Sequence, residues 1–346
     1  MPKVAVVVPN WNGEKSLAAC LDSLLSQSYE AKIIVVENGS TDGSSKLLQT
    51  KYQQVMVLSQ PKNLGFAGGV NVGIRQAISD GFKLVALFNN DAVADKKWLG
   101  FLVDELETHP KVGIATCKLT NANQSKLDST GDFYTSWGLP FPRGRGEAVS
   151  DRYDDQNNIF SASGGASLYR VSMLQKIGLF DEDFFAYYED VDISFRAQLA
   201  GWEVSYVPES KAYHQIGATS SKIKGFTTYQ TMKNLPWMLW KNAPASVFIR
   251  VLPRFIIAYS SFVISAAIRN QAQPAFHGFL SMLCLLPKKT WQRWHIQHHR
   301  KVKSSYIWGI MVHDLPPNAH KLKLLFHPVK TLSHRNWLLL IVSVGL

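Results

Sequence analysis

The sequence predicts an α/β fold whose mixed, mostly parallel sheet is flanked by helices and followed by a basic helical region. In the first part of the chain, short β-branched runs alternate with helical patterns at a spacing of about 25–30 residues per βα unit, as in layered nucleotide-binding folds. Hydrophobic residues make up 46% and charged residues 18% of the 346, which excludes a disordered or fibrous chain. The charge divides unevenly: residues 1–220 have a net charge of −5 and residues 221–346 one of +16.

Each predicted strand is a short apolar run, and each predicted helix has apolar residues at helical spacing. The predicted strands of the first region are Val4–Val8, Lys32–Val36, Val55–Leu58, Leu84–Phe88, Val112–Thr116, Ala166–Tyr169, Val204–Val207 and Ala212–His214. The predicted helices are Glu14–Gln27, Asp42–Thr50, Gly68–Ser79, Lys96–Thr108, a short helix after Tyr169 and one running from the acidic stretch 181–192 through Ala200. Glycines and prolines break this rhythm over residues 118–160, where we expect irregular loops.

The second region, residues 221–346, holds 17 Lys and Arg residues and a single acid, Asp314. Its uncharged runs, Phe255–Ile268 and Ala275–Leu286, are shorter than the ~20 residues of a spanning helix. Flanking tryptophans and cations indicate helices lying in a membrane interface against anionic headgroups, with Trp337–Leu346 as a further anchor. An ordinary helical domain with a basic surface is the alternative, and RNA binding is disfavoured because no RNA-recognition motif accompanies the charge. Three widely spaced cysteines indicate a reducing, cytoplasmic setting.

Polar segments follow the predicted strands, at the edge where open α/β sheets bind ligands. The segments 9–13 and 37–42 have the amides, hydroxyls and carboxylates that bind a base and a ribose, although the same residues also form turns and helix caps. The glycine-rich segment 63–73 suits either a diphosphate or close helix packing. Asp91 after the fourth strand suits Mg²⁺ or Mn²⁺, or a helix N-cap.

An acidic segment lies between residues 181 and 192. Two tyrosines directly precede Glu189 and Asp190, and desolvation by aromatic rings raises the pKa of a carboxyl group, which suits a general base. The same carboxylates also favour a helix N-terminus through its dipole, so the two interpretations are equal at this point. His214 follows the last strand, where a lone histidine is more often structural than a ligand.

Taken in order, these segments resemble the family 2 inverting glycosyltransferases with the GT-A fold, and within them bacterial rhamnosyltransferase-like members. The resemblance covers about residues 3–217 and rests on Val-Val-Pro-Asn-Trp-Asn-Gly, Val-Val-Glu-Asn-Gly-Ser-Thr-Asp-Gly-Ser, Asn-Leu-Gly-Phe-Ala-Gly-Gly-Val-Asn-Val-Gly, Phe-Asn-Asn-Asp, Gly-Gly-Ala, Tyr-Glu-Asp-Val-Asp-Ile-Ser-Phe-Arg and a late His-x-x-Gly. It implies a GT-A catalytic domain over residues 1–220, a membrane-association region over 221–346, and metal-dependent, inverting transfer of a sugar, rhamnose among the candidates.

The resemblance also implies a role for individual residues. It makes Asp190 the catalytic base, with Glu189 beside it orienting the acceptor, while Gly164 and Gly165 let the acceptor approach. Only the final carboxylate of the family's Asp-x-Asp motif is present, so Asp91 and His214 are the expected ligands of Mg²⁺ or Mn²⁺. The expected nucleotide-sugar-binding residues are Pro9, Asn10, Asn12, Glu37, Asn38, Asn63, Asn71, Asn90 and Asp91.

The partners implied are dTDP-rhamnose or a UDP-sugar, a lipid-linked or cell-surface glycan acceptor and an anionic membrane surface, with no nucleic acid. The expected location is the cytoplasmic face of the plasma membrane, with peripheral or monotopic attachment. A processive polysaccharide synthase is one alternative, although Trp291–Trp294 lacks the spacing of the Gln-x-x-Arg-Trp motif of such synthases. A non-catalytic, membrane-bound sugar-nucleotide-binding protein is the other alternative. The presence of four residues argues against it: Asp91, Glu189, Asp190 and His214.

Overall fold

The computed structural model describes residues 3–214, 223–317 and 319. The chain divides into two compact units, of which the first comprises residues 1–132 and 142–222 and the second residues 133–141 and 223–346. The segment 133–141, which the sequence-based division at residue 220 assigned to the first region, thus belongs to the second unit. The anchor predicted at 337–346 lies outside the described residues.

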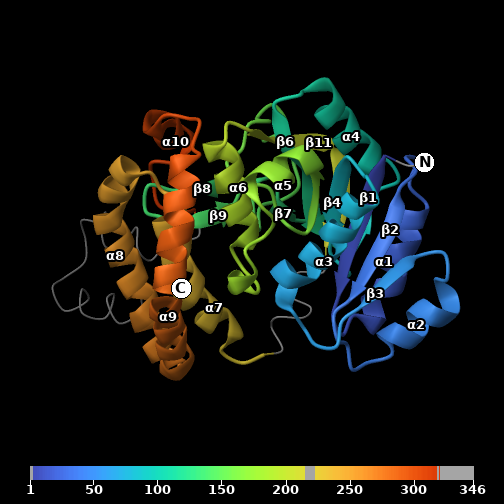
Figure 1. Ribbon diagram of the computed structural model, residues 1–346, viewed down its shortest axis with the longest axis horizontal. Coiled ribbons are helices and arrows are strands. Elements are labelled where there is room, and N and C mark those ends of the chain that lie inside the picture. Colours follow the sequence, from blue (N-terminus) through green and yellow to red (C-terminus); the bar gives the residue numbers. More distant parts are fainter. Residues whose placement is uncertain (1–2, 215–222, 318, 320–346) are drawn as a thin grey trace. The chain divides into compact units, whose positions relative to one another are not determined.

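The first unit is built on a mixed, mostly parallel sheet (Figure 1). Its path runs β3-β2-β1-β4-β10-β6-β11-β5, with β7 paired to β6. Neighbouring strands β3, β2, β1 and β4 are parallel, β10 runs antiparallel between β4 and β6, and β5 is antiparallel to β11. The strands are β1 (Val4–Asn10), β2 (Lys32–Glu37), β3 (Met56–Ser59), β4 (Leu84–Phe88), β5 (Ala92–Ala94), β6 (Val112–Asn121), β7 (Leu127–Ser129), β10 (Ala166–Arg170) and β11 (Glu203–His214).

Helices cover both faces of this sheet, which is why β1 and β4 are continuous apolar runs and do not alternate with polar residues. Val4, Val6 and Val8 pack in one core with buried side chains of α1, α2 and α4. On the opposite face, Gly73 of α3 lies directly against the side chains of Val7 and Val36, and only a residue without a Cβ fits there. The helices are α1 (Glu14–Leu25), α2 (Ser44–Lys51), α3 (Gly65–Ser79), α4 (Trp98–Thr108), α5 (Val171–Ile177), the 3₁₀ turn η1 (Glu182–Phe184) and α6 (Glu189–Leu199).

The predicted fold class is confirmed, and the differences concern particular elements. The two strands expected at 204–207 and 212–214 are one strand, β11, whose register against β6 shifts between Val207 and Lys211. Pro208 lies within that shift and has no N–H to donate, which accounts for the irregularity. The stretch 118–160, expected to be loops, extends β6 to Asn121 and contains β7.

The second unit is mainly helical. Its helices are α7 (Phe226–Asn242), α8 (Ala245–Ile268), α9 (Ala272–His298) and α10 (Ser304–Ile310), and β8 (Asp132–Tyr134) pairs with β9 (Pro140–Pro142). α7 packs along α9, where the Trp237 indole donates to the carbonyl of Met282 at 3.0 Å. Among the described residues, α8 is the one helix long and apolar enough to cross a membrane, by length and composition only.

Candidate functional site

The loops after β1 and β2 are tied together by polar side chains. Asn10 Nδ2 donates to Glu37 Oε2 at 2.7 Å, and Glu37 Oε1 accepts from the backbone N–H of Ser40 at 2.9 Å. The backbone N–H of Asn12 donates to Ser40 Oγ at 2.9 Å, and Asn90 Nδ2 donates to Asn10 Oδ1 at 2.7 Å. Asn10, Asn12, Glu37 and Asn90 therefore lie together beside half-buried Pro9, and their hydrogen bonds fix the shape of the loops after β1 and β2. That these residues bind a nucleotide stays a prediction.

A second set of amides fixes the start of α3. Asn38 Nδ2 donates to Asn63 Oδ1 at 3.1 Å and to the carbonyl of Gly65 at 3.0 Å, and its Oδ1 accepts from Leu64 N at 3.0 Å. Asn38 and Asn63 thus join the β2 loop to the glycine-rich helix start. Gly65 has a φ of +73°, and a Cβ there would meet the backbone and ring of Phe185, so glycine is required.

The amide of Asn71, expected beside the diphosphate, is occupied by partners within the protein. Its side chain is 2% exposed, donates to the carbonyl of Phe180 at 2.8 Å and accepts from the N–H of the same residue at 3.0 Å. Asn71 Nδ2 also donates to Glu182 Oε1 at 2.9 Å. The amide of Asn71 therefore anchors the segment before α6 to α3, and we do not retain it as a nucleotide-binding residue.

His214 lies between two carboxylates, Asp91 and Asp128. Its Nε2 is 3.0 Å from Asp91 Oδ1 and its Nδ1 is 2.8 Å from Asp128 Oδ2. Burial disfavours the imidazolium, but the hydrogen bonds and charges of the two aspartates outweigh burial and raise the pKa of His214 to about 9. β11 places His214 opposite Ala92 of β5, which brings it next to Asp91. The two predicted metal ligands are thus neighbours.

This arrangement fits a divalent cation. Metal-binding imidazoles commonly donate their other N–H to a carboxylate, and Asp128 is placed to accept from Nδ1. A cation bound by Nε2 and Asp91 would replace the proton that lies between these two atoms in the metal-free chain. A carboxylate oxygen and an imidazole nitrogen are both suitable ligands of Mn²⁺. Within the described part of the chain no group of three or more His, Cys, Asp or Glu side chains forms a metal site, so the fit concerns Asp91 and His214 alone.

Asp190 lies in the first turn of α6. Its Oδ2 accepts from the backbone N–H of Gly164 at 3.0 Å, and its Oδ1 accepts from that of Val191 at 2.8 Å. Burial raises the pKa of Asp190, and the two backbone hydrogen bonds oppose this rise. Glu189 is 7% exposed beside it. An ionised carboxylate of raised pKa is the state that a general base requires.

The loop before Glu189 holds three non-glycine residues in the left-handed region: Phe185 (φ +64°), Tyr187 (+70°) and Tyr188 (+72°). Such conformations are unfavourable for residues with a Cβ and concentrate at functional sites. The carbonyl of Phe185 accepts from Ala67 N at 3.2 Å, so the strained loop is tied to the start of α3.

Gly164 and Gly165 join the two halves of the site. A Cβ on Gly164 would lie 3.3 Å from Asp190 Cβ, and the carbonyl of Gly165 accepts from Asn89 N at 2.9 Å. The Asn89 amide in turn lies 3.3 Å from His214 Nε2. Asp190 and the Asp91–His214 pair therefore lie at one edge of the sheet, connected through two consecutive glycines.

Three charged residues next to this edge were not singled out from the sequence: Asp128, Asp132 and Arg145. Asp128 is 1% exposed, binds His214 and pairs with Arg145 at 2.8 Å. Burial and the charge of Asp190 raise the pKa of Asp132 to about 7. All three lie in the stretch 118–160, where the alternation of Arg143-Gly144-Arg145-Gly146 is the one local signal that points to an ordered, charged turn.

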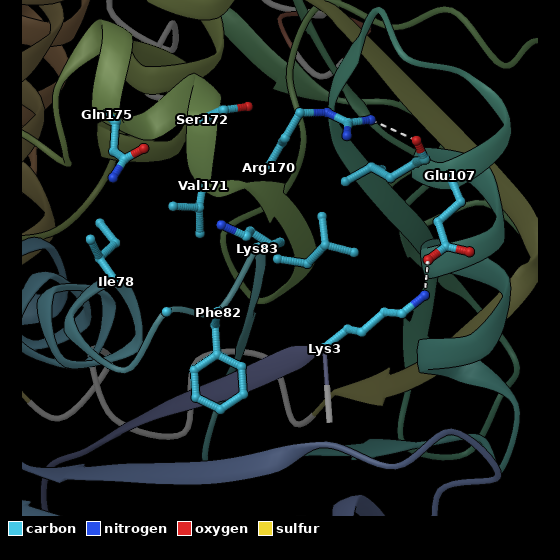
Figure 2. Close-up of a pocket in the computed structure, with 12 residues that line it drawn as sticks. Lys3, Ile78, Phe82, Lys83, Glu107, Arg170, Val171, Ser172 and Gln175 are labelled. Atoms are coloured by element: carbon cyan, nitrogen blue, oxygen red, sulfur yellow. Dashed lines mark hydrogen bonds and ion pairs between the residues drawn. The ribbon is translucent and has the colours of Figure 1, made fainter. Parts of the chain in front are cut away.

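A cavity of about 430 Å³ lies at the opposite edge of the same unit. It is lined at the start of β4 by Lys83 and Leu84 and at the end of β10 by Arg170. Figure 2 shows the guanidinium of Arg170 turned to α4, where it donates to the carbonyl of Leu106 at 2.6 Å, while Lys3 pairs with Glu107 at 3.3 Å. The cavity is therefore separate from the candidate site.

Comparisons with known proteins show what the chain and its fold are similar to. The chain is 28% identical over 234 residues to N-acetylglucosaminyl-diphospho-decaprenol L-rhamnosyltransferase of Mycobacterium tuberculosis, an alignment that covers 62% of this chain and 75% of the relative. Its fold is similar to that of S. aureus TarS 1–349 in complex with UDP, with a TM-score of 0.53, 19% identity and coverage of 89% and 92% of the two chains. It is also similar to the mannosyltransferase PcManGT of Pyrobaculum calidifontis in complex with GDP-Man and Mn²⁺, with a TM-score of 0.52, 16% identity and coverage of 86% and 84%.

Residues 5–178 match the family described as Glycosyl transferase family 2. The matched range contains the loops after β1, β2 and β4, the start of α3 and the two glycines at 164–165. Together with the mixed sheet and its structural relatives, this match establishes that the chain belongs to glycosyltransferase family 2 and has the GT-A fold.

Proposed function

We propose that this chain transfers a sugar from a nucleoside-diphosphate donor to a hydroxyl group of a lipid-linked glycan, with inversion at the anomeric carbon. The observation that supports this most directly is the connection of Asp190, through Gly164, Gly165 and Asn89, to His214. A direct displacement needs a base on the acceptor side of the sugar and positive charge on the diphosphate side. Asp190 and the Asp91–His214 pair, at one edge of the sheet, can supply these two.

In this mechanism Asp190 accepts the proton of the acceptor hydroxyl as that oxygen attacks the anomeric carbon and the bond to the diphosphate breaks. Glu189 orients the acceptor beside it, and the glycines at 164 and 165 leave room for the acceptor sugar. Asp91 and His214 would hold Mg²⁺ or Mn²⁺, and the ion would supply positive charge against the negative charge of the leaving diphosphate. The base and ribose lie against the loops ordered by Asn10, Glu37 and Asn38.

The donor and acceptor are proposed from chemistry and from similarity. The Mycobacterium tuberculosis relative is named for rhamnosyl transfer to a diphospho-decaprenol-linked sugar, which favours dTDP-rhamnose and a polyprenyl-diphosphate acceptor. Another structure of S. aureus TarS 1–349 contains UDP-GlcNAc, so a UDP-sugar is the other candidate donor.

The second unit supports attachment to an anionic membrane surface. Apolar side chains of α8 and α9 are exposed, and Trp291 and Trp294 are 65% and 63% exposed. Residues 221–346 supply a net charge of +16, complementary to anionic headgroups at the cytoplasmic face. Burying two indoles is worth several kcal/mol at roughly 1.5–3 kcal/mol each, so Trp291→Ala with Trp294→Ala should weaken binding to vesicles with anionic lipid by at least about tenfold.

Leu25→Ala, which removes an exposed apolar side chain of α1, is the control for that vesicle experiment. Co-sedimentation of the full chain with phosphatidylcholine vesicles, with and without phosphatidylglycerol, measures the binding. Equal binding of the double tryptophan variant and the control variant would contradict the membrane assignment.

The activity itself is tested with a panel of nucleotide-sugars, Mn²⁺ and a short lipid-diphosphate sugar. We expect release of nucleoside diphosphate together with one added sugar of inverted configuration, and loss of both in a chelator. His214→Ala should weaken Mn²⁺ binding, measured by electron paramagnetic resonance, whereas His109→Ala, at a half-exposed histidine paired with Glu105, should not. Donor binding without release indicates the non-catalytic alternative, and products with many sugars indicate a synthase.

A further inference from the structure

The segment around Arg145 is held against the segment that contains Asp128. Backbone hydrogen bonds join Leu127 N to the carbonyl of Glu147 at 2.9 Å and Gly146 N to the carbonyl of Leu127 at 2.9 Å. The neighbours of Arg145, Gly144 and Gly146, have φ values of +77° and +83°, which residues with a Cβ rarely adopt. The backbone therefore presents Arg145 in a defined place.

Two arginines of this segment have different surroundings. Arg143 is 5% exposed, donates to Thr130 and Gln156 and stacks over Tyr153 and Tyr206, so its guanidinium is part of the interior. The side chain of Arg145 is 53% exposed. Arg143 is thus a structural arginine, whereas Arg145 presents its cation to solvent.

Asp128 holds the guanidinium of Arg145 from one side. Arg145 Nε donates to the Asp128 carbonyl at 3.1 Å and its Nη2 lies 2.8 Å from Asp128 Oδ1. The first contact is a hydrogen bond and the second an ion pair. A guanidinium has five N–H groups, and those of Arg145 that are directed away from Asp128 can bind an anion. The other oxygen of Asp128 binds His214, so Arg145 is one carboxylate away from the pair that fits a cation.

The charge of Arg145 also reaches the other half of the site. It lowers the pKa of Asp128, of Asp132 and of Asp190 against the effect of burial. The guanidinium that Asp128 holds is therefore close enough to Asp190 to act on its charge, while Asp128 itself binds His214. Four aspartates surround this place, and an incoming diphosphate would meet strong repulsion without a cation beside it.

We propose that Arg145 binds a diphosphate ester at this site, with Asp128 as the positioning residue that holds its guanidinium. The proposal rests on the proposed function. Arg145 forms charge-assisted hydrogen bonds to phosphate oxygens through the N–H groups directed away from Asp128, a geometry in which a planar fork suits phosphate better than an ammonium group does. Both the donor and a polyprenyl-diphosphate acceptor contain such an ester.

The test is a binding measurement on the full chain in detergent, with Mn²⁺ present. Isothermal titration with UDP and with dTDP measures the donor side, and titration with a short polyprenyl diphosphate against the matching polyprenol measures the acceptor side. Arg145→Gln should weaken binding of one of these diphosphates by about 10–100-fold, the loss that follows removal of charge-assisted hydrogen bonds. Arg145→Lys keeps the charge but not the planar fork, so its affinity should lie between those of the wild type and Arg145→Gln. It replaces the glutamine variant if that variant folds poorly.

Arg152→Gln is the matched control, because Arg152 lies in the same region, is 69% exposed and pairs with Glu147. A loss on nucleoside diphosphate alone assigns Arg145 to the donor, and a loss on polyprenyl diphosphate alone assigns it to the acceptor. Unchanged affinity of both Arg145 variants for a probe that the wild type binds overturns this proposal and leaves the proposed function standing. A wild-type protein that binds no probe overturns both.

Discussion

Replacement of Asp190 by Asn tests the role of the base most directly. The side chain would keep its size and one acceptor oxygen, so either the Gly164 N–H or the Val191 N–H loses its partner. Because burial raises the pKa of Asp190, the folded state disfavours the charge that the substitution removes. These two effects oppose each other, and we expect the free energy of unfolding to change by no more than about 1 kcal/mol.

The effect on turnover should be far larger. Without a carboxylate in this place, no group accepts the acceptor proton in the transition state, and general-base catalysis typically contributes about 10²–10⁴-fold. This corresponds to about 2.7–5.4 kcal/mol of transition-state stabilisation. Donor binding, which we propose to depend on the loops after β1 and β2 and on the Asp91–His214 pair, should change less than about threefold.

The assay combines three measurements on the same preparation: thermal unfolding, binding of nucleoside diphosphate with Mn²⁺, and the initial rate of sugar transfer. Asp104→Asn, an exposed carboxylate on α4, controls for the loss of one negative charge. A turnover within tenfold of the wild type, with unfolding and binding unchanged, would refute the assignment of Asp190 as the base.

Two further predictions concern stability. Asp132 is protonated below about pH 7 in the folded chain, but only below ~3.9 in an unfolded one, so stability falls as pH rises through this window. The free energy of unfolding in urea, measured for Asp132→Asn and for the wild type, should therefore differ in favour of the variant. This difference should be about 1–3 kcal/mol larger at pH 8 than at pH 4, and a difference that does not change with pH would contradict the raised pKa of Asp132. Gly65→Ala should destabilise the fold by several kcal/mol, because the new Cβ would contact Phe185 and an alanine at φ +73° is strained. Gly81→Ala is the control, since Gly81 has φ +82° but lies in open space, and it should cost only about 1 kcal/mol. Equal losses of stability in the two variants would contradict the contact with Phe185.

The sequence was informative where local pattern determines structure. Apolar runs located β1, β2 and β4, and because parallel strands end at one edge, the residues after them were expected to meet there. Asn10 and Glu37 do meet, and Asp91 lies beside His214 although 123 positions separate them. A lone histidine gave no reason to expect His214 beside Asp91, and this expectation came from the family resemblance.

The part that could not be predicted depends on irregular backbone. Residues 118–160 have no sustained periodicity, so nothing in the sequence indicated that Asp128 would lie against His214 or that Arg145 would follow it there. The misplaced Asn71 has a similar cause: a helix in a glycine-rich segment was expected, but the direction of its buried amide follows from how the segment before α6 packs on it.

The loop before Glu189 is strained, and we relate this strain to the position of Asp190. Phe185, Tyr187 and Tyr188 each adopt a positive φ, and three such residues cost about 1–3 kcal/mol apiece relative to a relaxed loop. A turn of relaxed residues would enter α6 in a different direction and carry the first-turn carboxylate away from Gly164. Since the N–H of Gly164 is what aligns Asp190 with the glycines that lead to Asn89, the strain is tied to the position of one carboxylate. Tyr188→Gly permits φ +72° without strain but no longer restricts the loop to it, so this variant should hold Asp190 less firmly against Gly164. We expect urea unfolding to show no loss of stability from the backbone and the initial rate of transfer to fall, and an unchanged rate would contradict the link between strain and the position of Asp190.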